Sequence, residues 1–200
     1  MSRSIRPFLL LISAVALLMG GGCGDDDEER MQVVDLAGHV VNPLTQAAGD
    51  VALLLFVRSD CPISNRYAPE IRCLHEVLAD RGVRLFLVYV DPDEPVENIR
   101  RHLREFDLPG VPLRDLQHSL VKLAGATITS EAVVFNRSGE QVYLGRIDDR
   151  YVDFGKTRPE PTRRDLEEAL TAVLEGTIGP LHTTKAVGCF IADLKPAESD

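Results

Sequence analysis

The sequence predicts an α/β fold with a central mixed sheet flanked by helices. Two continuous apolar runs of strand length, Val51 to Val57 and Val83 to Val90, are typical of strands that are buried on both faces of a sheet. An amphipathic segment of helical length separates them, and this order favours a parallel pair, which needs a crossover connection. A later hairpin pattern adds antiparallel strands, so the sheet is expected to be mixed.

The elements follow one another in a regular order along the chain. An N-terminal extension around Val33 to Val41 precedes the first buried strand. Apolar residues then recur at intervals of three and four positions, which predicts one amphipathic helix that ends at Arg81-Gly82. These apolar residues are Tyr67, Ala68, Ile71, Leu74 and Leu78.

The second half of the chain continues with shorter elements. We predict a helix, a Pro/Gly-containing link, a short helix, a hairpin around the turn 136–140, and a last helix with Thr162 as its N-cap. The segments are Val96 to Phe106, Leu116 to Leu123, Ala132 to Phe135, Gln141 to Gly145, and Thr162 to Leu174. Strand, helix, strand, helix, hairpin and helix is the element order of the thioredoxin fold.

Residues 1–22 have the pattern of an export signal peptide. Arg3 and Arg6 precede an apolar stretch, Phe8 to Met19, which is shorter than the roughly 20 residues a helix needs to span a bilayer. Small residues then lead into Cys23, which resembles the lipobox of bacterial lipoproteins, whose cysteine is acylated. We expect an exported protein held at the membrane, periplasmic or outer envelope face, through lipid on Cys23. An ordinary secretory signal with an incidental cysteine is the alternative.

Composition places the rest of the chain among soluble globular proteins. The 200 residues are 44% hydrophobic and 26% charged, with 22 basic and 31 acidic residues and a net charge of −9. No basic stripe is present, so we expect no nucleic-acid partner. The acidic run in residues 23–32 predicts a solvated tether rather than a catalytic cluster, and residues 193–200 predict a polar tail. Residues 33–192 therefore form the single expected domain.

Cys61 lies at the turn between the first buried strand and the first helix. A helix N-terminus carries partial positive charge and unpaired N–H groups, which favour thiolate over thiol. We therefore expect a functional thiol with a pKa modestly below the free value of about 8.5, because Arg58 and Arg66 lower it whereas Asp60 and Glu70 raise it. A buried, inert cysteine is the alternative.

The sequence around this cysteine resembles a known family. Residues 59–71 (SDCPISNRYAPEI) are similar to the active-site segment of a peroxiredoxin-like subgroup of the thioredoxin superfamily, often described as redoxin or alkyl hydroperoxide reductase/thiol-specific antioxidant proteins. Residues 143–149 (YLGRIDD) and 184–191 (TKAVGCFI) match two further blocks, and the resemblance covers about Val33 to Ile191. It implies a thioredoxin-like redoxin domain with Cys61 as nucleophile. The implied active-site neighbours are Asp60, Pro62, Ser64, Thr129, Ser130 and Arg146.

The sequence also departs from the motifs of its relatives. Thioredoxins carry CxxC, but Ser64 occupies the position of the second cysteine. Peroxiredoxins carry PxxxTxxC, but Leu54 and Arg58 occupy the proline and threonine positions, so we expect poor peroxide turnover. Thr129-Ser130 replaces the threonine and cis-proline of thioredoxins. Because a non-proline cis bond costs roughly 3 kcal/mol, we expect this bond to be trans.

Two further cysteines are candidates to resolve Cys61. Cys73 lies on the same predicted helix, about 18 Å from Cys61 at 1.5 Å per residue, and a disulfide needs less than about 7 Å. Cys189 lies on a segment free to fold back, and Gly188 permits the tight backbone turn that a close approach needs. We predict a reversible Cys61–Cys189 disulfide with Cys73 reduced. Cys73–Cys189 is the competing pair, and a metal-ligand role for Cys189 stays open.

The remaining candidates carry weaker signals. Arg146, Asp148 and Asp149 follow the hairpin and predict either an ion pair that closes the site or a solvated turn. The histidines show no metal-ligand spacing to Cys61, and each is most simply a surface residue, although His182 shares a segment with Cys189. We therefore assign no metal ligands and expect no cofactor. The histidines are His39, His75, His102, His118 and His182.

These features together predict a thiol-dependent oxidoreductase outside the cytoplasmic membrane. Cys61 would pass through a mixed disulfide or a sulfenic acid, and its partner would be a thiol/disulfide protein or a small-molecule oxidant. The alternative is a non-catalytic module of the same fold that binds copper or a partner protein.

Overall fold

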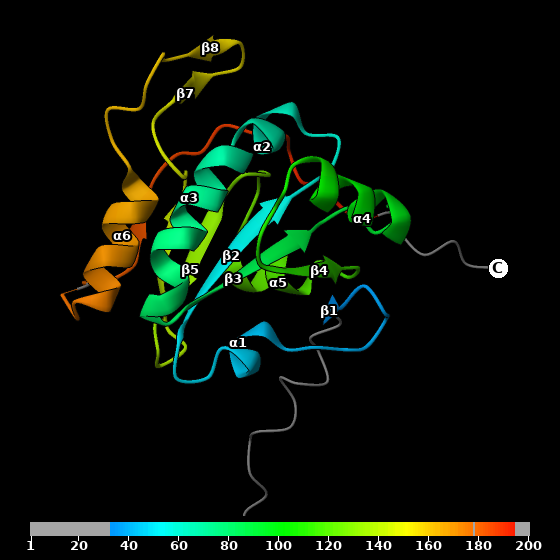
Figure 1. Cartoon of the computed structure of the whole chain (residues 1–200), viewed down its shortest axis with the longest axis horizontal. Helices are drawn as coiled ribbons and strands as arrows, with labels where there is room; N and C mark the ends of the chain where they lie inside the picture. The colour runs from blue at the N-terminus through cyan, green and yellow to red at the C-terminus, as the bar shows by residue number, and fades with distance from the viewer. Residues whose placement is uncertain (1–32, 178, 195–200) are drawn as a thin grey trace, which may run out of the picture.

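The computed structural model describes residues 33–177 and 179–194 (Figure 1). The predictions for the signal peptide, the acidic tether and Cys23 lie outside the described residues, as does most of the predicted polar tail. Within the described part, no helix is both long enough and apolar enough to cross a bilayer.

A seven-stranded mixed sheet forms the centre, in the order β1-β4-β3-β2-β5-β6-β9. Strands β2, β3 and β4 run parallel, β5 and β6 pair antiparallel, and β9 runs parallel to β6 at one edge. The strands are β1 (Val33–Val34), β2 (Val51–Val57), β3 (Val83–Tyr89), β4 (Val111–Asp115), β5 (Ala132–Phe135), β6 (Gln141–Gly145) and β9 (His182–Thr183). A separate hairpin of β7 (Tyr151–Asp153) and β8 (Lys156–Thr157) projects at the top of Figure 1.

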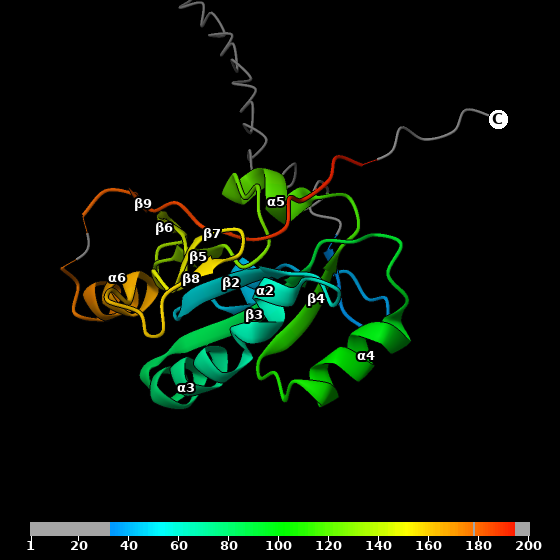
Figure 2. The same ribbon diagram turned by 90° about the horizontal axis from the view of Figure 1, so that it is seen from above.

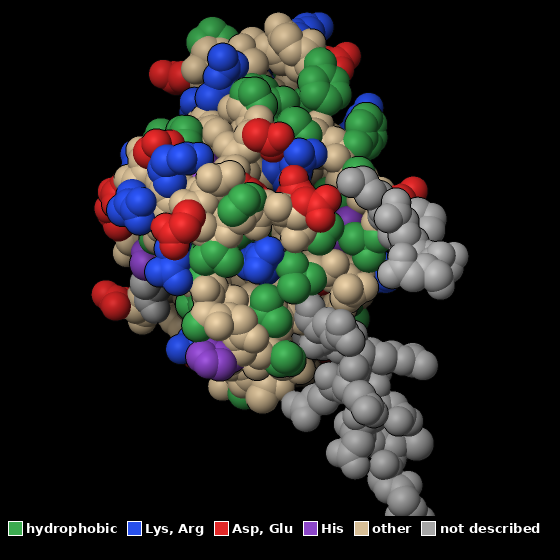
Figure 3. All heavy atoms as spheres, turned by 90° about the vertical axis from the view of Figure 1, so that its right-hand side faces the viewer, with side chains coloured by type: hydrophobic (Ala, Val, Ile, Leu, Met, Phe, Trp, Pro, Cys, Tyr) green, Lys and Arg blue, Asp and Glu red, His purple; other side chains and the backbone are tan. Residues whose placement is uncertain are grey.

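Helices cover both faces of the sheet, with α3 and α4 on one side and α5 on the other (Figure 2). They are α1 (Pro43–Gln46), α2 (Pro62–Arg66), α3 (Ala68–Leu78), α4 (Val96–Glu105), α5 (Ser119–Ala124) and α6 (Asp165–Leu174), with a 3₁₀ turn at Ala79–Arg81. These elements confirm the predicted α/β class with its mixed sheet. On the face that carries α4, acidic and basic side chains are interspersed (Figure 3).

Strand β2 shows why the predicted central run is apolar throughout. Leu53 and Leu55 point into the core shared with α3, α4 and α6, whereas Leu54 and Phe56 point into the core shared with α5. Side chains of a strand alternate between the two faces, so a strand covered on both faces has no solvent-facing position.

Four details of the predicted elements are wrong. The first helix breaks at Tyr67 into α2 and α3, because Pro69 cannot donate to the carbonyl four residues earlier and crowds it. The Pro/Gly-containing link predicted between two helices contains a strand, β4. The short helix begins at Ser119, where the buried Asp115 side chain accepts from its first N–H groups. The last helix begins at Asp165, because Thr162 binds the Asp149 carboxylate and does not cap the helix.

Candidate active site at a cysteine pair

Cys61 is the N-cap residue of the short helix α2 and lies four positions after β2 ends at Val57. Its backbone is extended, with φ −84° and ψ 110°, and Pro62 occupies the first helical position, where a missing N–H costs nothing. The Cys61 carbonyl accepts from Asn65 N at 3.1 Å, and the residue is 0% exposed. The predicted strand-to-helix turn is therefore present, and it holds a fully buried cysteine.

The segment 184–191, called the C-terminal strap below, crosses from the sheet edge to Cys61. Thr184 anchors its beginning, because the Thr184 N–H donates to Leu144 O at 3.0 Å. The Thr184 hydroxyl also lies 2.8 Å from the Tyr143 hydroxyl and accepts from the backbone N–H of Arg146 at 3.0 Å. The strap therefore leaves the sheet at a fixed point.

The far end of the strap pairs with the loop 127–130. Thr129 N donates to Cys189 O at 2.8 Å, Cys189 N donates to the Thr129 hydroxyl at 3.1 Å, and Ile191 N donates to Thr127 O at 3.0 Å. Gly188 lies so close to this loop that a Cβ would stand 1.9 Å from Thr129 O. Its φ is outside the left-handed region, so glycine is needed here for space and not for the predicted turn.

This pairing brings the two cysteines together. Cys189 Sγ lies 3.0 Å from Cys61 Sγ and donates toward it, and the Thr129 hydroxyl donates to the same Cys61 sulfur at 3.1 Å. Both cysteines are free, Cys61 is buried and Cys189 is partly exposed. A disulfide requires about 2.05 Å between the sulfurs, so a small movement would suffice to join them.

The surroundings of the two sulfurs shift their pKa values in opposite directions. Burial is the largest influence on Cys61 and raises its pKa, but hydrogen bonds from Cys189, from Ser64 and from Thr129 outweigh it and lower the pKa to about 7. Burial and the neighbouring Cys61 sulfur raise the pKa of Cys189 to about 11. Near pH 7, a large fraction of Cys61 is therefore thiolate, whereas Cys189 is a thiol.

Two buried serines, Ser64 and Ser130, continue the hydrogen-bonded contacts of the Cys61 sulfur. The Ser64 hydroxyl, which forms a hydrogen bond with Cys61, lies 3.0 Å from the Ser130 hydroxyl. The Ser130 N–H donates to Phe56 O at 2.7 Å. Ser130 adopts a φ of 72°, a left-handed conformation that is uncommon for a non-glycine residue. The described residues contain no cis peptide bond, so the Thr129–Ser130 bond is trans, as predicted.

The charged residues near Cys61 lie differently from the expectation. Arg58 Nη2 pairs with Asp60 Oδ2 at 2.9 Å and lies 3.6 Å from Asp91 Oδ2. Its charge is therefore directed to carboxylates. The lowered pKa of Cys61 was predicted. Its causes are hydrogen bonds to sulfur, which include one from the Ser64 backbone N–H in the first turn of α2, rather than the charges of the two arginines.

A partly buried chain of hydrogen bonds holds the turn that carries Cys61, and sequence reasoning missed it. Asn65 Nδ2 donates to Ser59 O at 2.9 Å, so its Oδ1 is the acceptor for His102 Nε2 at 2.8 Å. His102 Nδ1 then accepts from the Tyr89 hydroxyl at 2.8 Å. Burial lowers the pKa of His102, which suits a neutral imidazole. No local sequence signal connects these elements.

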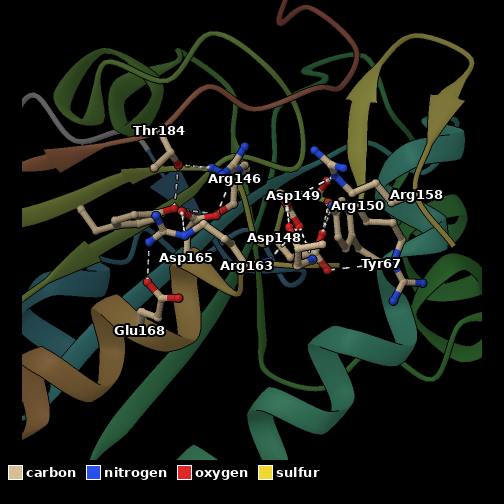
Figure 4. Close-up of polar contacts among 12 residues, drawn as sticks. Tyr67, Arg146, Asp148, Asp149, Arg150, Arg158, Arg163, Asp165, Glu168 and Thr184 are labelled. Atoms are coloured by element: carbon tan, nitrogen blue, oxygen red, sulfur yellow. Dashed lines mark hydrogen bonds and ion pairs between the residues drawn. The ribbon is translucent and has the colours of Figure 1, made fainter. Parts of the chain in front are cut away.

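Arg146, Asp148 and Asp149 form a second polar network beside α6 (Figure 4). Arg146 Nε pairs with Asp165 Oδ2 at 2.7 Å, and Asp149 binds Thr162. Asp148 is 1% exposed, and its Oδ1 accepts from the Tyr67 hydroxyl at 2.8 Å, just after α2. The solvated-turn alternative is therefore wrong. The network reaches the end of α2 through Tyr67, whereas Arg146 pairs with Asp165.

The other candidates lie apart from the cysteine pair. Cys73 is exposed on α3. The expectation of surface histidines is wrong for His102 and His118, which are buried. His102 bonds internally through both ring nitrogens, and His118 bonds Val90 O through Nε2. Within residues 33–177 and 179–194, no group of three or more His, Cys, Asp or Glu side chains is arranged to hold a metal ion.

Solved structures share this fold. An uncharacterised protein of Geobacillus kaustophilus matches with a TM-score of 0.69 and 23% identity, over 82% of this chain and 88% of that one. A thioredoxin-like protein of Aeropyrum pernix matches at 0.54 and 19%, over 74% and 92%. A candidate thiol:disulfide interchange protein DsbE of Chlorobium tepidum matches at 0.53 and 18%, over 66% and 84%. The comparison with curated proteins finds no match.

The fold and the strand-to-helix cysteine define a thioredoxin-like α/β protein. Residues 31–170 match the Redoxin family, which is well over half of the chain. The chain therefore belongs to the redoxin family.

Proposed function

We propose that the protein is a thiol-dependent oxidoreductase in which Cys61 is the nucleophile and Cys189 the resolving thiol. The observation that carries this proposal is the 3.0 Å approach of the two sulfurs, with the lowered pKa on Cys61 and the raised pKa on Cys189. A nucleophile must be a thiolate, and a resolving thiol that stays protonated does not compete with it for substrate. Membership of the redoxin family supports the same chemistry.

The reaction proceeds in two exchanges. The Cys61 thiolate attacks one sulfur of a substrate disulfide, so a mixed disulfide forms and the other substrate sulfur leaves as a thiolate that takes up a proton. Cys189 then loses its proton and attacks Cys61 Sγ, which releases the second substrate thiolate and leaves a Cys61–Cys189 disulfide. The substrate gains two electrons and two protons. The cysteine pair supplies both electrons and the Cys189 proton, and solvent supplies the second proton.

The strap decides which substrates can enter. Cys61 is fully buried beneath it, so a small oxidant can approach through local opening, whereas a protein disulfide requires the strap to move aside. Hydroperoxides would give a sulfenic acid on Cys61 and then the same disulfide with loss of water. We expect poor peroxide turnover, because Arg58, paired with Asp60, stands at the position of the peroxiredoxin threonine.

Cysteine variants test the proposal in a disulfide-reduction assay with dithiothreitol as donor. Cys61→Ser should abolish turnover. In Cys189→Ser, one exchange with a substrate disulfide in the absence of dithiothreitol should leave a stable mixed disulfide on Cys61, because no second thiol of the pair resolves it. Cys73→Ser is the matched control and should keep wild-type activity, since Cys73 is exposed and apart from the pair. Full activity of Cys61→Ser would contradict the proposal.

The proposal includes export and a lipid anchor at Cys23. The basic flank, short apolar core and small residues before Cys23 support it, and an oxidising compartment suits a reversible disulfide. Mass spectrometry of the mature N-terminus should find an acylated Cys23. A mature chain that begins at residue 24 or later without lipid would refute the anchor.

A further inference from the structure

The proposed reaction leaves Cys61 and Cys189 joined, and a donor thiol must open this disulfide before the next turnover. A thiolate attacks one sulfur along the S–S axis while the other sulfur leaves. The two sulfurs of this pair differ in their exposure to a donor and in their quality as leaving groups. Both differences favour attack of the donor on Cys189.

Access favours attack on Cys189. Cys61 is 0% exposed, and Ser64 and Thr129, which form hydrogen bonds with its sulfur, are themselves buried. Cys189 is partly exposed, and the next residue, Phe190, is 71% exposed, so this end of the strap faces solvent. A donor can therefore reach the Cys189 sulfur while the strap stays paired with the loop 127–130.

Leaving ability also favours attack on Cys189. When Cys189 is attacked, the departing sulfur is that of Cys61, which is positioned to accept from the Thr129 hydroxyl at 3.1 Å and from Ser64. Hydrogen bonds that stabilise a thiolate make it a better leaving group, because the thiolate with the lower pKa leaves faster. Attack on Cys61 would instead expel the Cys189 thiolate, whose pKa is raised by burial and which has no comparable set of hydroxyl donors.

We propose that Cys189 is the entry point for the electron donor, a thiol reductant, and that the donor forms its mixed disulfide with Cys189 rather than with Cys61. This inference rests on the proposed function. The donor thiolate forms a bond to Cys189 Sγ, the Cys189–Cys61 bond breaks, and the electron pair remains on Cys61 as a thiolate. A second donor thiolate then attacks the bound donor sulfur, which frees Cys189 to take up a proton and leaves the donor as a disulfide.

Oxidant and donor therefore use different sulfurs of one pair. The oxidised substrate reacts with the buried thiolate of Cys61, and the reductant reacts with the partly exposed sulfur at the end of the strap. The donor bound to Cys189 leaves the Cys61 thiolate in its hydrogen-bonded position, ready for the next oxidant.

The experiment uses the full-length protein with the Cys73→Ser substitution, which removes the exposed third thiol. The protein is oxidised, mixed briefly with glutathione at pH 7, quenched with acid over a time series and mapped by mass spectrometry. The earliest samples should carry glutathione on Cys189 in at least tenfold excess over Cys61. Glutathione mainly on Cys61, or equally on both, would overturn this inference but leave the proposed function standing. Failure to form the Cys61–Cys189 disulfide at all would overturn both.

A second measurement distinguishes the two directions of attack without trapping an adduct. Ser64→Ala removes a hydrogen bond to the Cys61 sulfur and should raise the pKa of that thiol. The rate at which glutathione opens the disulfide should then fall several-fold, because Cys61 is the leaving group. An unchanged or faster rate would mean that Cys189 leaves instead, and would overturn the inference.

Discussion

Replacing Gly188 with alanine adds a single methyl group, which should move the two cysteines apart. In Gly188→Ala the added Cβ would stand 1.9 Å from Thr129 O and 2.7 Å from Ile128 Cγ2, whereas Cβ contacts under 3.0 Å are essentially never found. The strap must therefore retreat by about 1 Å. A similar retreat of Cys189 would increase the 3.0 Å separation of the sulfurs to about 4 Å.

The expected magnitude follows from the bonds that the retreat breaks. The two bonds that hold Cys189 to Thr129, Thr129 N to Cys189 O and Cys189 N to the Thr129 hydroxyl, are worth about 1 kcal/mol each. Losing about 2 kcal/mol lowers an equilibrium constant about 30-fold, since each 1.4 kcal/mol is about a factor of ten. We therefore expect the Cys61–Cys189 disulfide to form about 30-fold less favourably in Gly188→Ala.

The assay equilibrates each variant in glutathione redox buffers and quantifies the disulfide by alkylation. Gly179→Ala is the matched control, because a Cβ at Gly179 meets no atom within 4 Å and its φ is outside the left-handed region. Circular dichroism establishes that both variants fold. In Gly188→Ala the pKa of Cys61 should also rise above about 7, because the hydrogen bond from Cys189 is lost. An equilibrium constant within about twofold of wild type would refute the reasoning.

Further predictions concern the groups around the pair. Alkylation of Cys61 by iodoacetamide should fall as the pH drops below about 7, because only the thiolate reacts; a midpoint near 9 would contradict the lowered pKa. Ser64→Ala should raise this midpoint by about one unit or more, since a hydrogen bond to a charged group is worth about 1.5–3 kcal/mol and one unit is 1.36 kcal/mol. Ser138→Ala, in the exposed hairpin turn, should leave it unchanged. Tyr67→Phe should lower the free energy of unfolding in urea by about 1–3 kcal/mol, because the buried Asp148 loses a donor; a loss under about 0.5 kcal/mol would show that the bond contributes little.

The predictable part of the fold is the part whose burial leaves a local pattern. Strands β2 and β3 are covered on both faces, so their sequences are continuously apolar, and the hairpin turn is marked by Asn136 and Gly139. Strand β4 was not predicted because Pro112 and Arg114 interrupt its short apolar run. Strand β9 was not predicted because it is only two residues long. Such strands exist because a neighbouring strand pairs with them, which a local pattern does not record.

The candidate site also has a part that the sequence predicts locally and a part that only the folded structure reveals. The position of Cys61 at a strand-to-helix turn was visible locally, and the free C-terminal segment made Cys189 a candidate partner. The contacts that hold the site join residues far apart in sequence, such as Asn65 with His102, and Tyr67 with Asp148, 81 positions away. Each is a single polar residue within an otherwise ordinary helix or turn, so only the packed structure reveals its partner.

Peptide mapping of the non-reduced protein decides whether Cys61 and Cys189 are a redox pair. The protein is oxidised by air, its free thiols are blocked, and the linked peptides are identified by mass spectrometry before and after reduction. We expect a reversible Cys61–Cys189 linkage with Cys73 free and alkylated. A Cys73–Cys189 linkage, or three free thiols after oxidation, would contradict it.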